Sequence, residues 1–291
     1  MKGSSNRNSG TRSRRGFFPL VLTACAVLLF NLPSSAQLVT LADQNSTATV
    51  NLGPGAGNSG GMTDWIVDGV NQLQQQWFWY RIGSSGPEQA INTIGGTTFT
   101  TPNARTLYLS YNNGAYGVSI NYLLTGSSIG TRSSDMSESI SITNGTGSAL
   151  DFHFYQYSDF QLAGIASGER VQLGKNLRGL YNEAKISRND SASSVQETVV
   201  TPGANEGEAA FYNSTLAKLS DGNTDTLNNN NDTINFGNAT WAFEWDLTIA
   251  PQSSVAISKD KLLHWDPVPE PSFGVLTGLA LAMVAVLRRR K

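Results

Sequence analysis

The sequence contains a single cysteine, Cys25, and only two histidines, His153 and His264, among its 291 residues. One cysteine excludes an internal disulfide and any metal site built from several thiolates. Charged residues are also scarce: they make up 14% of the chain, whereas typical soluble domains have about 25%. This low charge, together with 29 glycines and abundant Ser, Thr and Asn, favours an exported β-rich protein.

Acidic residues are missing from both ends of the chain. All 22 lie between Asp43 and Glu270, whereas nine of the 20 Lys and Arg residues lie in the first fifteen and the last four positions. The middle therefore has a net charge of −11 and both ends are basic. An acidic middle argues against nucleic acid as a partner, because phosphate binding needs clustered cations. Cations beside apolar runs are instead typical of membrane topology signals.

The first 36 residues have the three parts of a secretory signal peptide. Arg12, Arg14 and Arg15 precede an apolar run from Phe17 to Leu32, and a small-residue site, Ser34-Ser35-Ala36, follows it. We expect cleavage after Ala36. The alternatives are a retained anchor, or lipidation of Cys25 in Leu22-Thr23-Ala24-Cys25. The apolar residues that follow Cys25 disfavour lipidation.

The chain ends with prolines, an apolar run and cations, in that order. Sixteen mostly apolar residues, Ser272 to Leu287, would span about 24 Å as a helix, somewhat less than the ~30 Å hydrocarbon core. Pro269 and Pro271 set the start of that helix, because proline cannot continue one. The four terminal cations, Arg288, Arg289, Arg290 and Lys291, favour a short membrane span with a cytoplasmic end over a buried core helix.

This arrangement resembles a PEP-CTERM sorting signal, in which Pro269-Glu270-Pro271 is the motif. The resemblance covers residues 267–291. It implies export by a Gram-negative bacterium and processing at the motif by an exosortase, an integral-membrane cysteine peptidase. It also implies transient anchoring through the helix, and a final place at the cell surface or in an exopolysaccharide or biofilm matrix. What the exported body does is not implied.

Residues 37–266 have the pattern of an all-β domain. Short alternating runs such as "YGVSINYLL" and "TWAFEWDLTIAP" are separated by turn-forming residues, which predicts a β-sandwich, possibly of jelly-roll type. "SDMSES" and "KNLRGLYNEAK" are the most helix-like segments, and residues 220–238 are the most loop-like. Through the strings "FHFYQYSDF" and "WAFEWDLTIAP…ISKDK", the body also resembles the uncharacterised β-rich proteins found in front of such tails.

Catalytic and cofactor motifs are missing from this body. No G-x-S-x-G elbow, H-E-x-x-H helix or phosphate loop occurs. His153 is interpreted as a strand residue in aromatic packing, and His264 lies beside the exit linker. Glu244 and Asp246 share one strand face; they leave hydrolysis by paired carboxylates open, but we interpret them as solvated. The sequence therefore predicts no enzyme and no cofactor.

Two weaker binding sites can be considered. Asp221, Asn223, Asp225 and Asp232 have some of the spacing of a calcium loop, although Thr226 stands where the turn needs glycine, so a solvated loop is the better interpretation. In "QQQWFWYRIG", Trp77 and Trp79 share a strand face. If that face is exposed, the rings are able to stack on sugars; otherwise both faces are buried under loops.

Three functions remain open at this point. The first is a non-catalytic structural or adhesive protein of an extracellular polysaccharide layer. The second is a carbohydrate-binding module that uses Trp77 or Trp79, and the third is a secreted glycan-active enzyme. The sequence favours the first.

Tail processing gives a direct prediction. Protein isolated from its native host should begin after Ala36 and lack Ser272 to Lys291, because the tail serves only to stop the chain in the membrane for the peptidase. Intact-mass spectrometry measures this. Surface protein that still carries the complete tail would contradict the prediction.

Overall fold

The computed structural model describes residues 37–53 and 59–267, most of which lie in two antiparallel β-sheets. Sheet A contains β1 (Leu38–Asp43), β2 (Ser46–Asn51), β3 (Gly61–Val67), β4 (Val70–Asn71), β5 (Leu73–Ile82), β6 (Gln89–Ala90), β11 (Leu150–Phe160), β15 (Glu206–Phe211) and β16 (Ala239–Ile249). Sheet B contains β7 (Thr98–Asn103), β8 (Thr106–Asn112), β9 (Tyr116–Gly126), β10 (Ser133–Asn144), β12 (Glu169–Lys175), β13 (Tyr181–Arg188), β14 (Ser194–Thr201) and β17 (Ser253–His264). Three short helices, α1 (Ser214–Lys218), η2 (Ile91–Thr93) and η3 (Leu162–Gly164), lie between strands.

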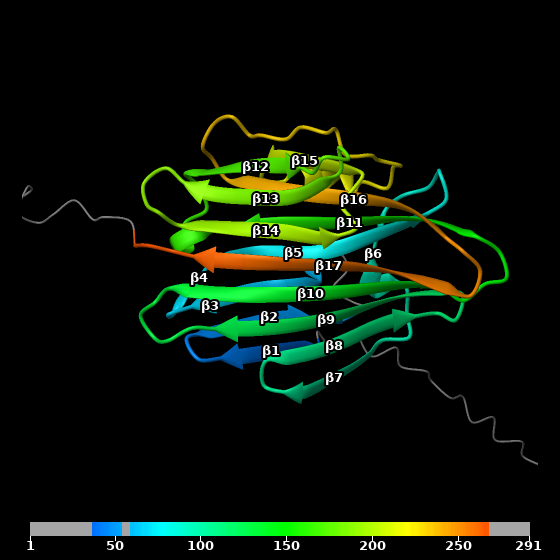
Figure 1. The fold of residues 1–291 in the computed structure, drawn as a ribbon, viewed down its shortest axis with the longest axis horizontal. Helices are drawn as coiled ribbons and strands as arrows, with labels where there is room; N and C mark the ends of the chain where they lie inside the picture. The colour runs from blue at the N-terminus through cyan, green and yellow to red at the C-terminus, as the bar shows by residue number, and fades with distance from the viewer. Residues whose placement is uncertain (1–36, 54–58, 268–291) are drawn as a thin grey trace, which may run out of the picture. The chain divides into compact units, whose positions relative to one another are not determined.

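The sheets lie one behind the other as the two layers of a sandwich (Figure 1). Sheet A has the order β1-β2-β3-β5-β11-β16-β15, and sheet B has the order β12-β13-β14-β17-β10-β9-β8-β7. The chain passes from one sheet to the other after β6, β10, β11, β14 and β16, and the connections after β10 and β16 are short turns. The Asn144 side chain ties these turns together, donating to the carbonyls of Ile249 (3.0 Å) and Ala250 (3.1 Å). The all-β prediction is confirmed, but the sheets hold more strands than the eight of a jelly roll.

Two segments with helical propensity are strands instead. "SDMSES" lies inside β10, and "KNLRGLYNEAK" forms the end of β12, a turn and the start of β13. Met136 and Glu138 alternate inward in β10, and the strand pairs along its whole length with β9 and β17. This pairing outweighs local propensity. The predicted loop over residues 220–238 is confirmed, since no named strand or helix begins in it.

Aromatic side chains fill the space between the sheets. Phe78 stacks on Phe154, and Phe160 stacks on Trp241, each with ring centroids 5.3 Å apart. These residues come from β5, β11 and β16, the central strands of sheet A. Aromatic pairs in such offset or edge-on geometries add to the stability already gained by burying their surface.

Four charged side chains lie among these rings. Lys259, Lys261, Glu138 and Glu197 project into the sandwich from sheet B, and each side chain has 0% exposed surface. Glu138 forms an ion pair with Lys259 (2.6 Å) and accepts a hydrogen bond from Lys261 (2.7 Å). From sheet A, the Gln156 side-chain amide and the Trp241 indole N–H donate to the Glu197 carboxylate at 2.7 and 2.9 Å.

The charges in this buried network depend on one another. Burial by itself would raise the pKa of Glu138, but the ammonium groups of Lys259 and Lys261 lower it. Burial lowers the pKa of Lys259, and Glu138 acts against that effect. The two cations and two anions balance, so the network is neutral as a whole. Removing one member leaves an uncompensated charge in a dry core.

The Glu138→Gln variant should therefore lose about 3–5 kcal/mol of unfolding free energy, as breaking a buried ion pair does. Urea denaturation followed by tryptophan fluorescence measures it. The same change at Glu183, on an outward position of β13, should cost less than about 0.5 kcal/mol. The double variant Glu138→Gln/Lys261→Met, which restores neutrality, should recover part of the loss. Equal stability of the Glu138 and Glu183 variants would contradict the prediction.

Candidate functional site

A cluster of one imidazole and several carboxylates lies on the outer face of sheet A. In the ladder of β11 and β16, His153 is opposite Asp246 and Tyr155 is opposite Glu244. On the other side of β16, Glu206 of β15 is opposite Glu244. Because strand residues alternate between faces, the phenylalanines and tryptophans of these strands point into the sandwich and leave the titratable groups outside.

His153 is surrounded by carboxylates. Its Nδ1 lies 2.5 Å from an oxygen of Asp246 and 3.8 Å from an oxygen of Glu244. Its Nε2 lies 3.6 Å from Asp151 Oδ1 and has no hydrogen-bond partner among the described residues. The bond to Asp246 fixes the plane of the ring and favours a proton on Nδ1.

Glu244 is the buried member of the cluster, with 1% of its surface exposed. The backbone N–H of Leu227 donates to its Oε2 at 3.0 Å, so the loop over residues 220–238 covers it. Burial raises the pKa of Glu244 to about 7, and the neighbouring charges of Asp246 and Glu206 contribute to the rise. Glu244 is therefore able to release or take up a proton near neutral pH.

The nearest cation is already engaged. Arg81 of β5, opposite His153 in the ladder, donates to Glu88 (2.9 Å) and to the Tyr155 hydroxyl (3.0 Å). Its charge is thus balanced by Glu88 next to the cluster. The group around His153 remains acidic, and this excess of carboxylates helps to keep Glu244 protonated.

His153, Glu244 and Asp246 also have the composition of a metal site, since their ligand atoms lie within 4.8 Å of one another. Among the described residues, they are the only group of three or more such side chains. However, two atoms bound to one ion at about 2.1 Å in tetrahedral geometry would lie about 3.4 Å apart. The 2.5 Å contact of His153 with Asp246 is a hydrogen bond. In this geometry, the cluster is arranged for proton transfer.

The two tryptophans proposed for sugar binding are fully buried. Trp77 and Trp79 each have 0% exposed surface. Trp77 packs so closely against β3 that a Cβ on Gly61 would lie 2.5 Å from its ring, and Trp79 meets Tyr157 edge-on with ring centroids 6.3 Å apart. Trp77 also meets Tyr111 of β8 edge-on, with ring centroids 6.2 Å apart. The interpretation as exposed stacking platforms is therefore wrong, and the alternative of buried rings holds.

The four residues of the calcium candidate do not form one site. Asp221 accepts from the backbone N–H of Asn223 (2.8 Å) in a local turn. Asp232 pairs with Arg170 (2.5 Å), which lowers the pKa of Asp232 to about 2. The backbone N–H of Asp225 donates to Glu88, 3.2 Å away. The loop interpretation thus agrees with the described structure.

The signal peptide, with its cleavage site at Ala36 and Cys25, lies outside the described residues. So do the sorting motif, Pro269 to Pro271, the predicted transmembrane helix and the four terminal cations. Within residues 37–53 and 59–267, no helix has the length and hydropathy needed to cross a bilayer.

Sequence reasoning noticed the members of the cluster but not the cluster itself. Glu244 was interpreted as solvated, and this is wrong because the loop buries it; Asp246 keeps 41% of its side chain exposed, as expected. His153 was assigned to packing. Two patterns in the sequence pointed to the cluster. His153 and Tyr155 share the outer face of one aromatic strand, and Glu244 and Asp246 share the outer face of another.

Comparison with known proteins gives no match to a family model or to a curated protein. A solved bacterial glucoamylase in complex with acarbose aligns with 79% of this chain, at 11% identity and a TM-score of 0.53. This chain covers 34% of the glucoamylase, about a third of its length. A galactose mutarotase-like protein from Lactobacillus casei aligns with 78% of this chain and 100% of its own, at 9% identity and a TM-score of 0.47. A GalM/aldose epimerase homologue from C. elegans has 7% identity and a TM-score of 0.43 over 81% of this chain and 100% of its own.

These comparisons change one prediction. At such low identity, the glucoamylase likeness shows a shared fold, and the two lower TM-scores carry no argument. The sequence predicts that the chain is not an enzyme. The glucoamylase likeness contradicts this prediction, because part of a glucoamylase has the same fold as this sandwich.

Proposed function

We propose that this protein is exported and sorted to the cell surface through its carboxyl-terminal tail, and that it acts there on a carbohydrate by proton transfer at the His153–Glu244–Asp246 cluster. The observation that carries the proposal is the buried Glu244 carboxyl, with a pKa of about 7, beside an imidazole that Asp246 orients. Groups that titrate near the working pH are the most effective general acids and bases.

The export part rests on the sequence alone. The signal peptide over residues 1–36 would direct the chain across the inner membrane, and a short transmembrane helix within residues 267–291 would hold it there until an exosortase processes Pro269-Glu270-Pro271. The mature protein would then reside at the surface or in the exopolysaccharide matrix of a Gram-negative biofilm. That location brings polysaccharide within reach, and the glucoamylase that shares the fold was solved with a carbohydrate-like ligand, acarbose.

Each member of the cluster has a distinct task in this proposal. Glu244, with a pKa of about 7, stores a proton beside His153 and supplies it to the reaction. His153 accepts a proton from the substrate or from water, and the carboxylate of Asp246 stabilises the imidazolium that forms. Asp246 and Asp151 are 41% and 53% exposed, so substrate would approach from their side of the cluster.

Glu244→Gln should reduce turnover by about 10²–10⁴-fold, because the amide cannot supply the proton. Release of reducing ends from the polysaccharide of the native host measures this, with the protein purified from that host. Asp246→Asn should lower the rate, because the amide cannot stabilise the imidazolium as the carboxylate does. The same carboxylate-to-amide change at Glu183 on sheet B is the control and should leave the rate unchanged.

The reaction should continue in the presence of EDTA, since the cluster transfers protons without an ion. Native protein that releases no reducing ends from that polysaccharide would refute the proposal. So would a Glu244→Gln variant that retains the full rate.

Glu244 should also make stability depend on pH. The pKa of Glu244 in the folded protein, about 7, lies above its ordinary value of 4.5. Its contribution to the unfolding free energy is therefore complete below about pH 4.5 and is lost as the pH rises through 7. The loss amounts to at most about 3 kcal/mol. Asp159 and Glu169, whose pKa values burial raises to about 7 and about 8, add to the same slope.

Urea unfolding at pH 5, 6, 7 and 8 measures this slope. The native protein should lose stability across the series. Glu244→Gln should lose less, because glutamine stays neutral, whereas Glu183→Gln should follow the native protein. Identical slopes for all three proteins would show that Glu244 does not titrate in this range.

A further inference from the structure

The outer face of sheet B carries a continuous row of uncharged polar side chains. Six strands contribute one residue each, and neighbours in the row are direct partners in the ladders. We call the set the hydroxyl row: Thr100, Tyr108, Asn121, Ser139, Ser258 and Thr201. With neighbouring strands about 4.8 Å apart, the row is roughly 24 Å long.

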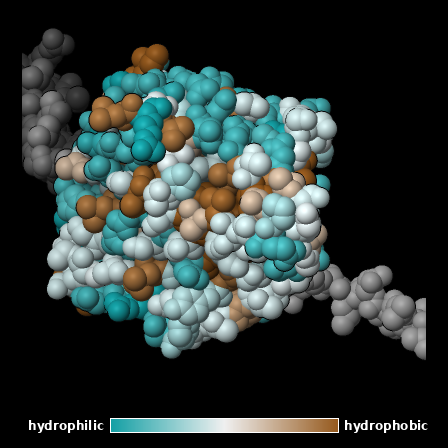
Figure 2. Space-filling model, turned by 45° about the vertical axis from the view of Figure 1, so that its right-hand side comes forward, coloured by the Kyte–Doolittle hydropathy of each residue, from teal (hydrophilic) through white to brown (hydrophobic). Residues whose placement is uncertain are grey.

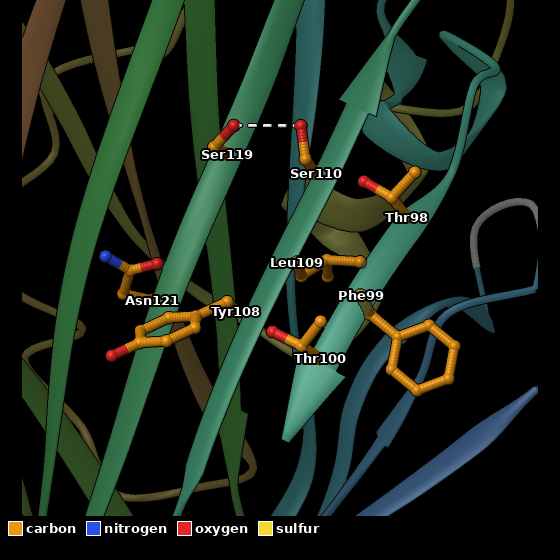
Figure 3. A pocket seen from close by; sticks show the side chains of 8 residues that line it. All are labelled: Thr98, Phe99, Thr100, Tyr108, Leu109, Ser110, Ser119 and Asn121. Carbon is orange, nitrogen blue, oxygen red and sulfur yellow. Dashed lines mark hydrogen bonds between the residues drawn. The ribbon is translucent and has the colours of Figure 1, made fainter. Parts of the chain in front are cut away.

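The side chains of the hydroxyl row are available to a ligand. Five of the six residues are exposed and Ser258 is half-buried. No hydrogen bond joins their side chains to another residue in the described part of the chain. In the next register row, by contrast, Ser110 and Ser119 bond to each other at 2.9 Å, as Figure 3 shows.

Two shallow depressions follow the hydroxyl row and share Asn121. One, of about 300 Å³, lies over β7, β8 and β9 and includes Thr100 and Tyr108; its lining is drawn in Figure 3. The other, of about 610 Å³, extends over β9, β10, β17 and β14 and includes Ser139 and Ser258. Together they form a shallow groove across the sheet.

Tyr108 provides a flat apolar surface in this groove. Its side chain is 46% exposed, and it lies between Thr100 and Asn121 in the ladder (Figure 3). An exposed tyrosine offers an aromatic face together with a hydroxyl group at low conformational cost. Sugars match this combination, because a pyranose has an apolar face and a rim of hydroxyl groups.

The charges in the groove select against anionic ligands. Among the residues that line the two depressions, Asp260 is the one charged side chain on the outer face. Asp135, the ladder partner of Leu262, interacts with Asp260 from outside the lining. Glu138 and Lys259 also border the groove, but their side chains point into the core. Burial and the nearby Asp260 raise the pKa of Asp135 to about 6. A further negative charge would be repelled here.

Protein partners fit this face less well than glycans do. Specific protein interfaces have a buried apolar core. Here the exposed aliphatic residues beside the row, Leu123 and Val200, come from strands that β10 and β17 separate. Figure 2 shows one side of the molecule, with teal groups mainly over its upper part, pale surface of intermediate hydropathy below, and brown groups that are most extensive near the middle of the view.

We propose that the hydroxyl row binds a single chain of neutral polysaccharide laid across the strands, with one sugar stacked on Tyr108 and the other side chains bonded to sugar hydroxyls. This site lies on the opposite sheet from the His153–Glu244–Asp246 cluster. It therefore does not depend on the proton-transfer function proposed above.

Affinity gel electrophoresis of the full protein tests the site. The probes are laminarin, hydroxyethylcellulose and dextran as neutral glycans, and alginate as an anionic one. At least one neutral glycan should slow migration, and alginate should not. Tyr108→Ala should weaken the apparent affinity by about tenfold through loss of the stacked ring. Thr100→Ala and Asn121→Ala should each have a smaller effect.

Tyr212→Ala is the matched control, because Tyr212 is a similarly exposed tyrosine (54%) that lies outside the row. It should bind as the native protein does. The proposal is overturned if no neutral glycan retards the protein, if alginate binds as strongly, or if the Tyr108 and Tyr212 variants behave alike. It is also overturned if Tyr108→Ala converts a dimer to a monomer, because the face would then bind a second copy. The assay involves no turnover, so its failure is distinguishable from failure of the proposed enzyme activity.

Discussion

The sandwich depends on the four charges enclosed between its sheets. Moving Lys259, Lys261, Glu138 and Glu197 out of water costs several kcal/mol per ion, and only close, well-aligned partners offset that cost. Three strands of sheet B supply the ions, while Gln156 and Trp241 of sheet A complete the bonding of Glu197. Hydrogen bonds are more directional than aromatic packing, so we infer that the bonds to Glu197 help to set how the sheets stack.

This constraint extends to the outer face of sheet A, because the same strands serve both sides. In β11, the Gln156 side chain points toward the ions, whereas the side chains of Tyr155 and His153 lie on the other face of the strand. β16 does the same with Trp241 and Glu244. The cluster is thus held by strands whose inner residues have little freedom to move. Such support is what an acid–base pair needs, since small displacements of its members change the rate strongly.

Alternation along single strands made much of this fold predictable. The alternation of Trp241, Phe243 and Trp245 identified the inner face of β16. In β17, Lys259 and Lys261 lie on the same strand face as Ile257 and Leu263, and this already indicates that the two lysines point into the core. Their partners were not predictable in that way. His153 and Asp246 are 93 residues apart, and only the register of β11 with β16 makes them neighbours. The burial of Glu244 depends on Leu227 in an irregular loop, for which no periodicity exists. The tryptophans of β5 were ambiguous because alternation cannot show whether loops cover the outer face.

The two outer faces of the sandwich differ because only one of them is covered. The connection between β15 and β16 lies over sheet A, where backbone N–H groups of Leu227 and Asn228 bond to Glu244 and Glu208. Enclosure in this way raises the pKa of Glu244 to about 7, which suits proton transfer. Within residues 37–53 and 59–267, no such connection lies over the hydroxyl row of sheet B, whose uncharged groups suit binding without chemistry. A chain held on sheet B points away from the cluster on sheet A, so one stretch of polysaccharide cannot occupy both. The hydroxyl row would therefore keep the protein within a matrix, while the cluster acts on other chains that reach the opposite face.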